Sequence, residues 1–581
     1  GYLLFDGTNN SQLKALDHAF ESLAKHMSGL HVDYHFGDET MIKRHGAVRD
    51  GRLWIGQYGY TTVVLPQMVT IDENTLRLLV EFAAQGGHII AAGALPTTVG
   101  GRKADAALEQ LRQAVVIPKD STDFDLKVSQ WSRYAVDVRR EGALAEQIHL
   151  CQRTLSDGKR MCWLVNTSHD EGLSMVRVSI PGHWRPVMLD VSTLEETTPD
   201  AFLDSESTCL QLDFAPMQSY MLILEEGEPQ VHQQTQQPIV LPLVPKQWEI
   251  VRMDPGCLTL DLCEYRVDEG PWMPQKAVIR LFKELLAQQR DCDISLRFHF
   301  QVSRVEDIGE LELVLETPEK FSIVVNDQPV PYTDHGWWKD TSMKRLPIRE
   351  HLREGDNTIV LSCRFHQRQK VYDVLYGKGV YETEKNKLTY DTELESIYLI
   401  GNFGVISESA FEKGPRAALT TDGGFVLVKQ PTVFAPGSFT QQGLCFFAGC
   451  VTVQCPFVVT KQQLESGKPI LLSLPKPMAA MIQVSVNQKP VKALLWAPYE
   501  VDVTAFVREG ENILSVELFS GNRNLLGPHH HVNGEVYNVG PSSFEGVFGW
   551  VERPTEAVAI EPWMRTKNYW SDRYCFVEFG I

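Results

Sequence analysis

Several signatures that would identify a chemistry are missing from this chain of 581 residues. No apolar run is long enough to cross a bilayer, which takes about 20 residues in a helix. No G-x-G-x-x-G or G-x-x-x-x-G-K-[ST] motif follows a predicted strand, so no phosphate-binding loop is expected. The formal net charge of −19 argues against nucleic acid, because phosphate binding needs a basic surface. We therefore expect neither a membrane nor a nucleic acid as partner.

Cysteine is sparse and unpatterned. The eleven cysteines include no C-x-x-C pair, and the first 118 residues contain none. Cys162, Cys363 and Cys450 stand inside predicted strands, where a reduced thiol behaves as a small hydrophobic side chain. Reduced core cysteines favour a cytoplasmic location over an oxidising compartment. The chain opens on Gly1 without a signal-peptide pattern, and we expect this start to lie partway through a domain.

One sequence block occurs twice, about 155 residues apart. The first copy reads VNDQPV at residues 325–330 and LREGDNTI at 352–359, and the second reads VNQKPV at 486–491 and VREGENIL at 507–514. In each copy an alternating apolar run ends in an Asn-centred turn, and a Gly-containing turn starts the next run. Alternation and Asn/Gly turns are typical of antiparallel strands with one buried face. The repeat therefore predicts two related β-sandwiches with Gly355 equivalent to Gly510.

The periodicity predicts a multidomain chain of α/β plus all-β parts. Residues 1–118 alternate helices (10–28 and 72–84) with strands (31–36, 61–66 and 88–93), as in a parallel α/β layer of the flavodoxin or amidotransferase kind. Residues 119–228 predict a small antiparallel β-sandwich, and the Gln- and Pro-rich stretch 229–243 predicts a linker. The two repeat-bearing sandwiches, which we expect to be jelly rolls, then occupy residues 244–428 and 429–581, with one helix near 275–289.

The α/β layer has few candidates for catalysis. An amidotransferase needs a cysteine at a sharp strand-to-helix turn, but the strand end at residues 91–94 reads AAGA, so a non-catalytic role is expected. Asp38 and Glu39 follow the predicted strand 31–36, where side chains commonly face a ligand in α/β sheets. They are weak catalytic candidates, because a glycosidase needs a second carboxylate across the scissile bond and none can be assigned. A structural or supporting role next to the site is the alternative.

Tryptophans are frequent in the repeat-bearing half. Adjacent Trp337 and Trp338 cannot both point into a sandwich, because successive strand side chains alternate. An exposed tryptophan can stack on a sugar ring, with Asp334 and Arg345 nearby to bind hydroxyls. Core or interface packing is the alternative for each tryptophan, and Trp496, at the matching place in the second copy, is expected in the core.

Three consecutive histidines follow Gly527 and Pro528. They project in different directions from a loop, whereas a metal site needs converging ligands, so no metal site is predicted there. The sequence predicts no cofactor and leaves room for a structural calcium ion.

Several motifs in this order resemble the C-terminal part of large bacterial glycoside hydrolases of the α-L-rhamnosidase kind, family 106. The matching segments are residues 6–10 with 34–39, 60–66, 153 with 163–168, 258–265, 398–405 and 522–530. The two R-E-G-acid-N turns also resemble the galactose-binding-like modules of family 2 glycosidases. The resemblance implies a carbohydrate as partner and a catalytic (β/α)8 barrel on the N-terminal side of these domains.

This chain departs from the resemblance at the barrel. A barrel takes about 250 residues of alternating strands and helices, whereas only the first 118 residues show that pattern. The first hypothesis is therefore an accessory region that braces a catalytic domain absent from this chain and binds glycan. The alternatives are a stand-alone carbohydrate-binding protein, and a glycosidase with its site between the α/β layer and the first repeat-bearing sandwich.

Overall fold

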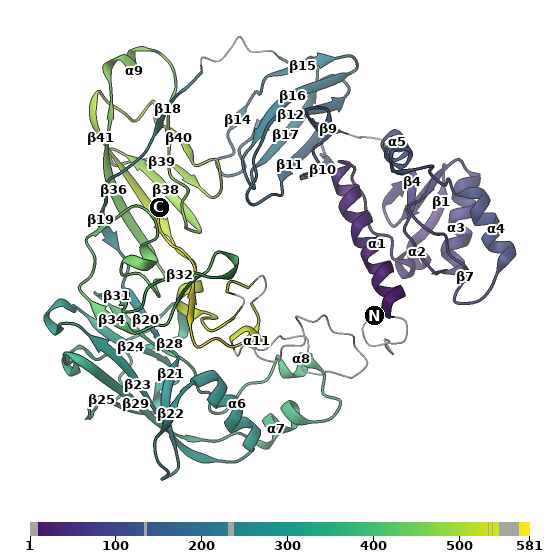
Figure 1. Cartoon of the computed structure of the whole chain (residues 1–581). Helices are drawn as coiled ribbons and strands as arrows, with labels where there is room; N and C mark the ends of the chain where they lie inside the picture. Colours follow the sequence, from purple (N-terminus) through teal and green to yellow (C-terminus); the bar gives the residue numbers. More distant parts are fainter. Residues whose placement is uncertain (1–9, 133–135, 231–236, 533, 537–538, 545–568) are drawn as a thin grey trace. The chain divides into compact units, whose positions relative to one another are not determined.

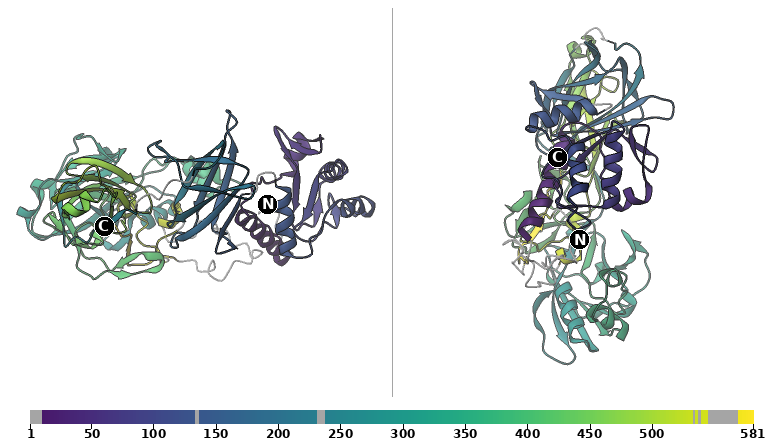
Figure 2. Two further views of the ribbon diagram at one scale, coloured as in Figure 1. Left: turned by 90° about the horizontal axis from the view of Figure 1, so that it is seen from above. Right: turned by 90° about the vertical axis from the view of Figure 1, so that its right-hand side faces the viewer.

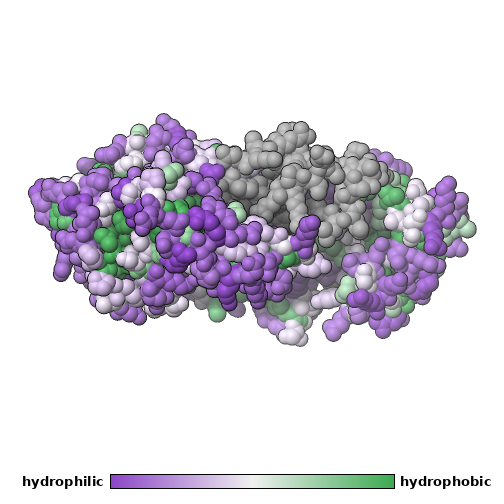
Figure 3. Space-filling model, turned by 90° about the horizontal axis from the view of Figure 1, so that it is seen from below, coloured by the Kyte–Doolittle hydropathy of each residue, from purple (hydrophilic) through white to green (hydrophobic). Residues whose placement is uncertain are grey.

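The computed structural model describes residues 10–132, 136–230, 237–532, 534–536, 539–544 and 569–581. The chain divides into two compact units, the first made mainly of residues up to 235 and the second mainly of residues from 236 on (Figure 1). Strands form most of the regular structure, as expected for a largely β chain. Hydrophilic residues predominate on the face shown in Figure 3. Within the described ranges, every helix is too short or too polar to span a bilayer.

The first part of the N-terminal unit is a small α/β layer (Figures 1 and 2). Strands β4 and β6 pair in parallel as predicted, and Ile90 forms a parallel bridge to Val116. Helix α3 is capped by Asp72, whose side chain accepts the Asn74 amide, and buries Phe82 against the strands. The elements are α1 (Asn10–Gly29), α2 (Glu39–His45), β1 (Gly46–Arg49), β2 (Arg52–Ile55), β3 (Tyr58–Tyr60), β4 (Thr62–Leu65), β5 (Thr70–Ile71), α3 (Glu73–Ala84), β6 (His88–Ala91), β7 (Thr98–Val99), α4 (Asp105–Ala114) and α5 (Ser121–Trp131).

This part differs from the sequence expectation in three respects. Residues 31–36, expected as a strand, are irregular, because His31 has a φ of 59° and leaves the extended region. Strands β1, β2 and β3 form an antiparallel meander that the sequence did not predict. Residues 121–131 form helix α5 rather than the start of a sandwich. Phe124 and Val128 of α5 share a core with Met27 of α1, so the helical layer extends past residue 118.

The second part of the N-terminal unit is the expected antiparallel β-sandwich. Its two sheets have the strand orders β10-β11-β17-β13-β14 and β15-β16-β12-β8-β9. Alternate residues, such as Leu164 of one sheet and Val178 of the other, are fully buried in a common core. The strands are β8 (Asp137–Arg140), β9 (Ala143–Leu144), β10 (Ile148–Thr154), β11 (Arg160–Asn166), β12 (Leu173–Pro181), β13 (Trp184–Leu189), β14 (Glu196–Thr197), β15 (Ala201–Asp204), β16 (Ser207–Phe214) and β17 (Ser219–Glu226).

The C-terminal unit contains a first sandwich in which two sheets share one large core. The sheet orders are β20-β30-β24-β28-β27 and β22-β21-β23-β29-β25-β26, with β31 and β34 attached to the second. Leu313 and Leu361 represent the two inner faces, and the amphipathic helix α6 covers part of the core. The elements are β20 (Gly256–Leu260), β21 (Leu262–Val267), β22 (Met273–Ala277), α6 (Val278–Gln288), β23 (Cys292–Val302), β24 (Leu311–Glu316), β25 (Ser322–Val325), β26 (Gln328–Pro329), β27 (Trp337–Trp338), β28 (Asp340–Pro347), β29 (Gly355–Phe365), α7 (Gln369–Tyr376), α8 (Glu382–Lys385), β30 (Ile397–Gly401), β31 (Gly404–Ser407) and β34 (Phe425–Val428).

A second sandwich surrounds the first in sequence. Its sheets have the orders β35-β19-β36-β41-β38-β39 and β18-β37-β40, and Trp248 of β19 is fully buried in its core. Strands β18 and β19 precede the first sandwich, and β35 follows it. The elements are β18 (Ile239–Pro242), β19 (Trp248–Met253), β35 (Val433–Phe434), β36 (Cys450–Val459), α9 (Lys461–Glu465), β37 (Ile470–Ser473), β38 (Met481–Val486), β39 (Lys489–Leu494), β40 (Glu500–Asp502), β41 (Gly510–Phe519) and α10 (Arg523–Leu526).

The expected linker and module boundaries differ from this pairing. Residues 239–242, placed in the linker from their Gln- and Pro-rich surroundings, pair in parallel with β37. Residues 248–253, placed in the first sandwich, pair with β36 of the second. The strands β32 (Glu412–Lys413), β33 (Leu419–Thr421) and β42 (Tyr574–Phe576) form a small sheet, and α11 (Pro541–Phe544) is a short helix that precedes β42 in the chain. Phe576 lies in the core of the first sandwich and Phe579 in the core of the second, so the last residues join both.

The two copies of the repeat adopt the same arrangement, which confirms the prediction. Strand order β23-β29-β25-β26 corresponds to β36-β41-β38-β39. In the first copy, the buried Asn357 side chain accepts from Asn326 Nδ2 (2.7 Å) and donates to the Arg353 carbonyl (2.7 Å). In the second, Asn512 makes the matching bonds at 2.8 Å each. Gly355 and Gly510 have φ values of 78° and 88°, a conformation that favours glycine.

Candidate functional site

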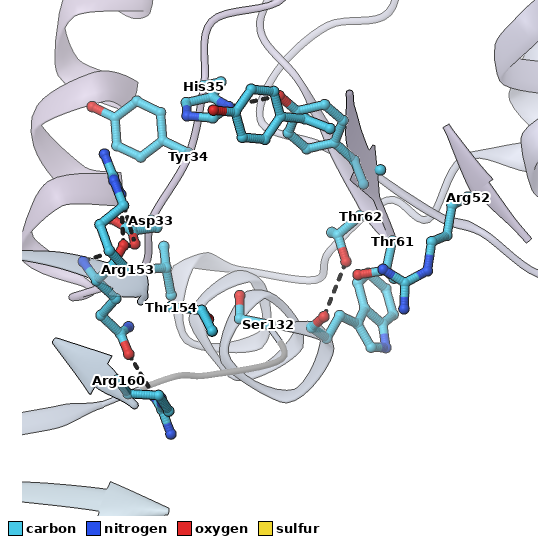
Figure 4. A pocket seen from close by; sticks show the side chains of 16 residues that line it. Asp33, Tyr34, His35, Arg52, Thr61, Thr62, Ser132, Arg153, Thr154 and Arg160 are labelled. Carbon is cyan, nitrogen blue, oxygen red and sulfur yellow. Dashed lines mark hydrogen bonds and ion pairs between the residues drawn. The ribbon is translucent and has the colours of Figure 1, made fainter. Parts of the chain in front are cut away.

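A cavity of about 600 Å³ lies in the N-terminal unit between the α/β layer and the sandwich (Figure 4). The α/β layer contributes the irregular residues 32–35, the ends of β2, β3 and β4, and Trp131 of α5. The sandwich contributes residues 152–154 of β10 and Arg160 of β11. The volume falls within the range of about 300–1,000 Å³ typical of small-molecule sites.

Two hydrogen bonds join the walls of this cavity. The Gln152 backbone N–H of β10 donates to Asp33 Oδ2 at 2.9 Å. His31 Nε2 lies 3.1 Å from the Ala145 carbonyl and must donate to it, and the His31 ring is buried. His31 and Asp33 are therefore bonded to the sandwich, whereas Tyr34 and His35 contact the α/β layer through the Ala24 carbonyl and the Tyr60 hydroxyl.

Asp33 is the carboxylate that lines the cavity. It lies 3.5 Å from Arg153 Nη1. Burial raises the pKa of Asp33, although the Gln152 N–H and Arg153 act in the opposite direction. Arg160 Nη2 donates to Gln152 Oε1 at 2.7 Å, and its guanidinium lies 5.1 Å from the Trp184 ring centre.

Aromatic and hydroxyl groups complete the lining. His35 Nδ1 lies 2.6 Å from the Tyr60 hydroxyl, and Tyr58 contacts the His35 ring edge-on. Trp131 is held in place because its ring stacks on His88 and its carbonyl accepts the Thr62 hydroxyl at 3.2 Å. The cavity thus combines apolar ring faces with planar polar groups and hydroxyls, which are the groups that bind a polyhydroxyl ligand.

The lining of the cavity contains one carboxylate. Glycoside hydrolysis uses two carboxyl groups about 5–9.5 Å apart, whereas Asp33 is the single carboxylate among the lining residues. Across the described part of the chain, no group of three or more His, Cys, Asp or Glu side chains is arranged to hold a metal ion.

Asp38 and Glu39, the weak catalytic candidates, lie outside the cavity lining. Asp38 caps helix α2 by accepting the Met41 N–H at 2.9 Å. Glu39 Oε1 accepts the N–H of Asp72 at 2.7 Å, next to the start of α3. Both carboxylates bond to backbone N–H groups at helix ends in this structure.

The candidate sugar-binding residues of the first sandwich gather at the edge formed by β27 and β28. Trp337 is 53% exposed, whereas Trp338 packs against the core, as alternation predicts. Asp334 accepts the Gly336 N–H at 2.8 Å, and Arg345 Nε donates to Glu312 at 2.6 Å. The structure brings these residues to one edge, with each polar group already bonded within the sandwich. Trp550 and Trp563 lie outside the described residues, as does the motif at residues 6–9.

The histidine triplet is buried and not in an open loop. His530 Nδ1 lies 2.9 Å from the Ser571 carbonyl, and its Nε2 lies 3.1 Å from Asp261 Oδ2. Both partners are acceptors, so both ring nitrogens carry hydrogen and His530 is an imidazolium. The Tyr574 hydroxyl donates to the other Asp261 oxygen at 2.9 Å. His529 also lies 3.7 Å from Asp261.

His530 and Asp261 each stabilise the charged form of the other. Burial lowers the pKa of His530, but Asp261 outweighs it and holds the pKa above its ordinary value. Burial likewise acts to raise the pKa of Asp261, but His530 and His529 hold it far below its ordinary value. The pair fastens the segment after α10 to the first sandwich, where Thr259 also donates to the Leu525 carbonyl at 2.6 Å.

Sequence reasoning did not single out Asp33, Arg52 or Arg160. The signal that could have found Asp33 is its place in an unusually polar and aromatic run, HVDYHF at residues 31–36, followed by a second aromatic run, YGY at 58–60. The contact between Asp261 and His530 had no local signal, because the two residues are far apart in sequence.

Comparison with known proteins finds glycoside hydrolases. No family model matches the chain. A stretch of 126 residues is 30% identical to a protein of Formosa agariphila named "Putative beta-glucuronidase". That stretch covers 21% of this chain and 11% of the relative, so the chain spans a small part of the curated protein that it matches.

Solved structures similar to parts of the chain include rhamnosidases and family 2 glycosidases, the two groups that the motifs resemble. A rhamnosidase from Novosphingobium sp. PP1Y is 13% identical with a TM-score of 0.25, over 61% of this chain and 35% of that one. An α-L-rhamnosidase from Streptomyces avermitilis is 11% identical with a TM-score of 0.20, over 66% and 36%. A family 2 β-galacturonidase from Eisenbergiella tayi is 10% identical with a TM-score of 0.17, over 46% and 37%. The chain spans about a third of these structures, and its similarity is to part of each glycoside hydrolase.

Proposed function

We propose that this chain is a non-catalytic, saccharide-binding region of a carbohydrate-active glycoside hydrolase. The motif resemblance and the 126-residue match to a protein named as a β-glucuronidase support the enzyme class. In this proposal the two repeat-bearing sandwiches are galactose-binding-like jelly rolls, and the region braces a catalytic barrel within a longer protein. The α/β layer is of the flavodoxin or amidotransferase kind without a catalytic role.

The cavity in the N-terminal unit carries the proposal. It has the volume of a small-molecule site, and it offers ring faces (Tyr58 and Trp131), planar polar groups (Asp33 and Arg153) and the hydroxyl of Thr62. A pyranose has apolar C–H faces and equatorial hydroxyls, so it needs both kinds of group from its site. Asp33 alone cannot supply both leaving-group protonation and oxocarbenium stabilisation, which favours binding over turnover.

The edge formed by β27 and β28 is a second candidate site. The exposed ring of Trp337 favours it, with Trp338, Asp334 and Arg345 at the same edge. Because Arg345 is already paired with Glu312 and Asp334 with a backbone N–H, a sugar there would share these groups with the sandwich. We therefore rank this site second.

Titration of the full chain with rhamnose-, galactose- and uronate-containing oligosaccharides, followed by calorimetry, tests the proposal. We expect dissociation constants between about 1 mM and 1 µM, or about 4–8 kcal/mol of binding free energy. Tyr58→Ala should weaken binding about tenfold if the cavity is the site, because the ring face is lost. Trp337→Ala should do so if the sandwich edge is the site. The exposed Tyr381, which lines neither site, supplies the matched control Tyr381→Ala.

Two outcomes would overturn the proposal. Absence of binding to any saccharide would remove the binding role. Hydrolysis of aryl glycosides by the full chain, abolished by Asp33→Asn, would make the cavity catalytic, and abolition by Asp38→Asn or Glu39→Gln would restore the glycosidase alternative.

A further inference from the structure

The charge of the cavity lining is opposite to that of the whole chain. The chain carries a formal net charge of −19. The lining holds three arginines, Arg52, Arg153 and Arg160, against one aspartate, Asp33. The lining of this cavity thus carries more positive than negative side chains, although the chain as a whole is acidic.

The arginines approach the cavity from both walls. Arg52 belongs to β2 of the α/β layer, and Arg153 belongs to β10 of the sandwich. Figure 4 shows these two side chains on opposite sides of the cavity. Arg160 lies deeper, is 7% exposed, and stacks over Trp184 while bonded to Gln152. These contacts hold the Arg160 side chain in place, so we assign it a structural role in the cavity wall.

Arg52 and Arg153 keep hydrogen-bonding capacity toward a ligand. A guanidinium offers five N–H donors in a planar fork that matches a carboxylate. Arg153 uses donors on the Gln152 carbonyl and lies 3.5 Å from Asp33, a separation longer than a hydrogen bond of good geometry. Within the residues that the structure describes, no carboxylate lies within ion-pair distance of Arg52.

We infer that the cavity binds an acidic oligosaccharide, in which carboxylates of different sugar units pair with Arg52 and Arg153. This inference rests on the proposed saccharide-binding function and names its ligand class. A neutral sugar would leave Arg52 without a counter-charge, whereas a uronic acid supplies one and still presents its ring to Tyr58 and its hydroxyls to His35 and Thr62. Sulfate esters have a different, tetrahedral geometry and serve as the contrasting anion.

The test compares two ligands that differ at carbon 6 of each sugar. The full chain is titrated calorimetrically with a galacturonic acid trimer and with the corresponding galactose trimer, at low salt and at about 0.5 M NaCl. We expect the acidic trimer to bind at least about tenfold more tightly at low salt, and to lose most of this advantage at high salt because the charges are screened.

Substitutions locate the effect. Arg52→Gln and Arg153→Gln should each reduce affinity for the acidic trimer about tenfold or more and leave affinity for the neutral trimer nearly unchanged. Arg112→Gln is the matched control, because Arg112 is an exposed arginine of α4 in the same unit and lies outside the lining. The salt series on the unaltered chain keeps the test decisive if either lining variant fails to fold.

The outcomes separate this inference from the proposed function. Equal binding of both trimers would overturn the acidic preference and leave saccharide binding intact. Absence of binding by either trimer would overturn both. An acidic preference that persists in both arginine variants would overturn this location, and preference for a sulfated trimer over the uronate would overturn the carboxylate assignment.

Discussion

His530 and Asp261 are oppositely charged in the interior of the C-terminal unit, and their protonation is linked to its stability. The folded-state pKa of His530 is raised, so its contribution is fully present below the ordinary value of about 6.5 and is lost as pH rises through the folded pKa. The folded-state pKa of Asp261 is lowered, so its contribution is present above about 3.8 and is lost as pH falls through the folded pKa.

These signs predict a pH-dependent stability. Above about pH 6.5, the unaltered chain should lose free energy of unfolding as the pH rises through the folded-state pKa of His530, and His530→Gln should remove most of that slope. Urea unfolding of both proteins at several pH values measures it. Parallel profiles for the two proteins would show that His530 is not the titrating group.

Removing the Asp261 carboxylate should lower the free energy of unfolding more than removing an exposed carboxylate does. Asp261→Asn leaves the His530 imidazolium buried without its counter-charge, for which we expect a loss of about 3–5 kcal/mol in the free energy of unfolding. Asp327→Asn is the control, because Asp327 is exposed in a turn of the same sandwich. Urea unfolding at pH 6 compares them, and similar losses for the two variants would contradict a charged pair.

At the scale of elements, a hydrogen-bond network centred on one asparagine occurs in both sandwiches. This network explains why the same sequence motif occurs twice. Asn357 satisfies the backbone N–H and C=O of Arg353 and the side chain of Asn326, all within a tight turn between strands. Its replacement leaves buried polar groups without partners, which is costly. Residues of this kind are fixed by the turn and not by a ligand.

Asn357→Ala should lower the free energy of unfolding by about 2–4 kcal/mol, since several buried hydrogen bonds are lost together. Asn512→Ala should cost a similar amount in the second sandwich, because its bonds match. Glu354→Ala, at an exposed neighbouring position, is the control. Denaturant unfolding monitored by tryptophan fluorescence provides the values. A loss below about 1 kcal/mol for either Asn variant would mean that water replaces the network.

Element type was easier to predict than the partners of each element. Helix α3, strands β4 and β6 and both repeat hairpins follow from periodicity and turn residues, because these signals are local. Residues 31–36 alternate like a strand, but their bonds go to the sandwich through Asp33 and His31. Trp496, expected in the core by analogy with the first copy, is 40% exposed. Among the candidate site residues, the sequence singled out Trp337 and Trp338, which remain a prediction, but not Asp33, whose hydrogen-bond partner Gln152 belongs to a different sheet.

At the scale of the whole molecule, the first sandwich is inserted in sequence between strands of the second. This order determines which fragments of the chain can fold by themselves. Strands β18 and β19 belong to the second sandwich although they precede the first, and Trp248 fills its core. Residues 229–243 were predicted as a linker because Gln and Pro outnumber apolar residues there. The alternating Ile239, Leu241 and Leu243 within this stretch are a strand pattern that the prediction did not use. Near the C-terminus, Phe576 packs in the core of the first sandwich and Phe579 in the core of the second.

A fragment of residues 429–581 should therefore not fold cooperatively, whereas residues 237–581 should. The short fragment lacks two strands and the buried Trp248, and a missing core tryptophan alone costs about 3–5 kcal/mol. Differential scanning calorimetry distinguishes them. A sharp transition for 429–581 would show that β18 and β19 are dispensable.

The order of the strands along the chain also determines when they can pair during synthesis on the ribosome. β19 emerges about 200 residues before its partner β36, so at about 5–20 residues per second it waits about 10–40 seconds with one apolar face uncovered. Most strands of the first sandwich are synthesised during that interval and can begin to pair. Until β36 is synthesised, the apolar side chains of β19, including Trp248, therefore lack the strand that covers them in the folded protein.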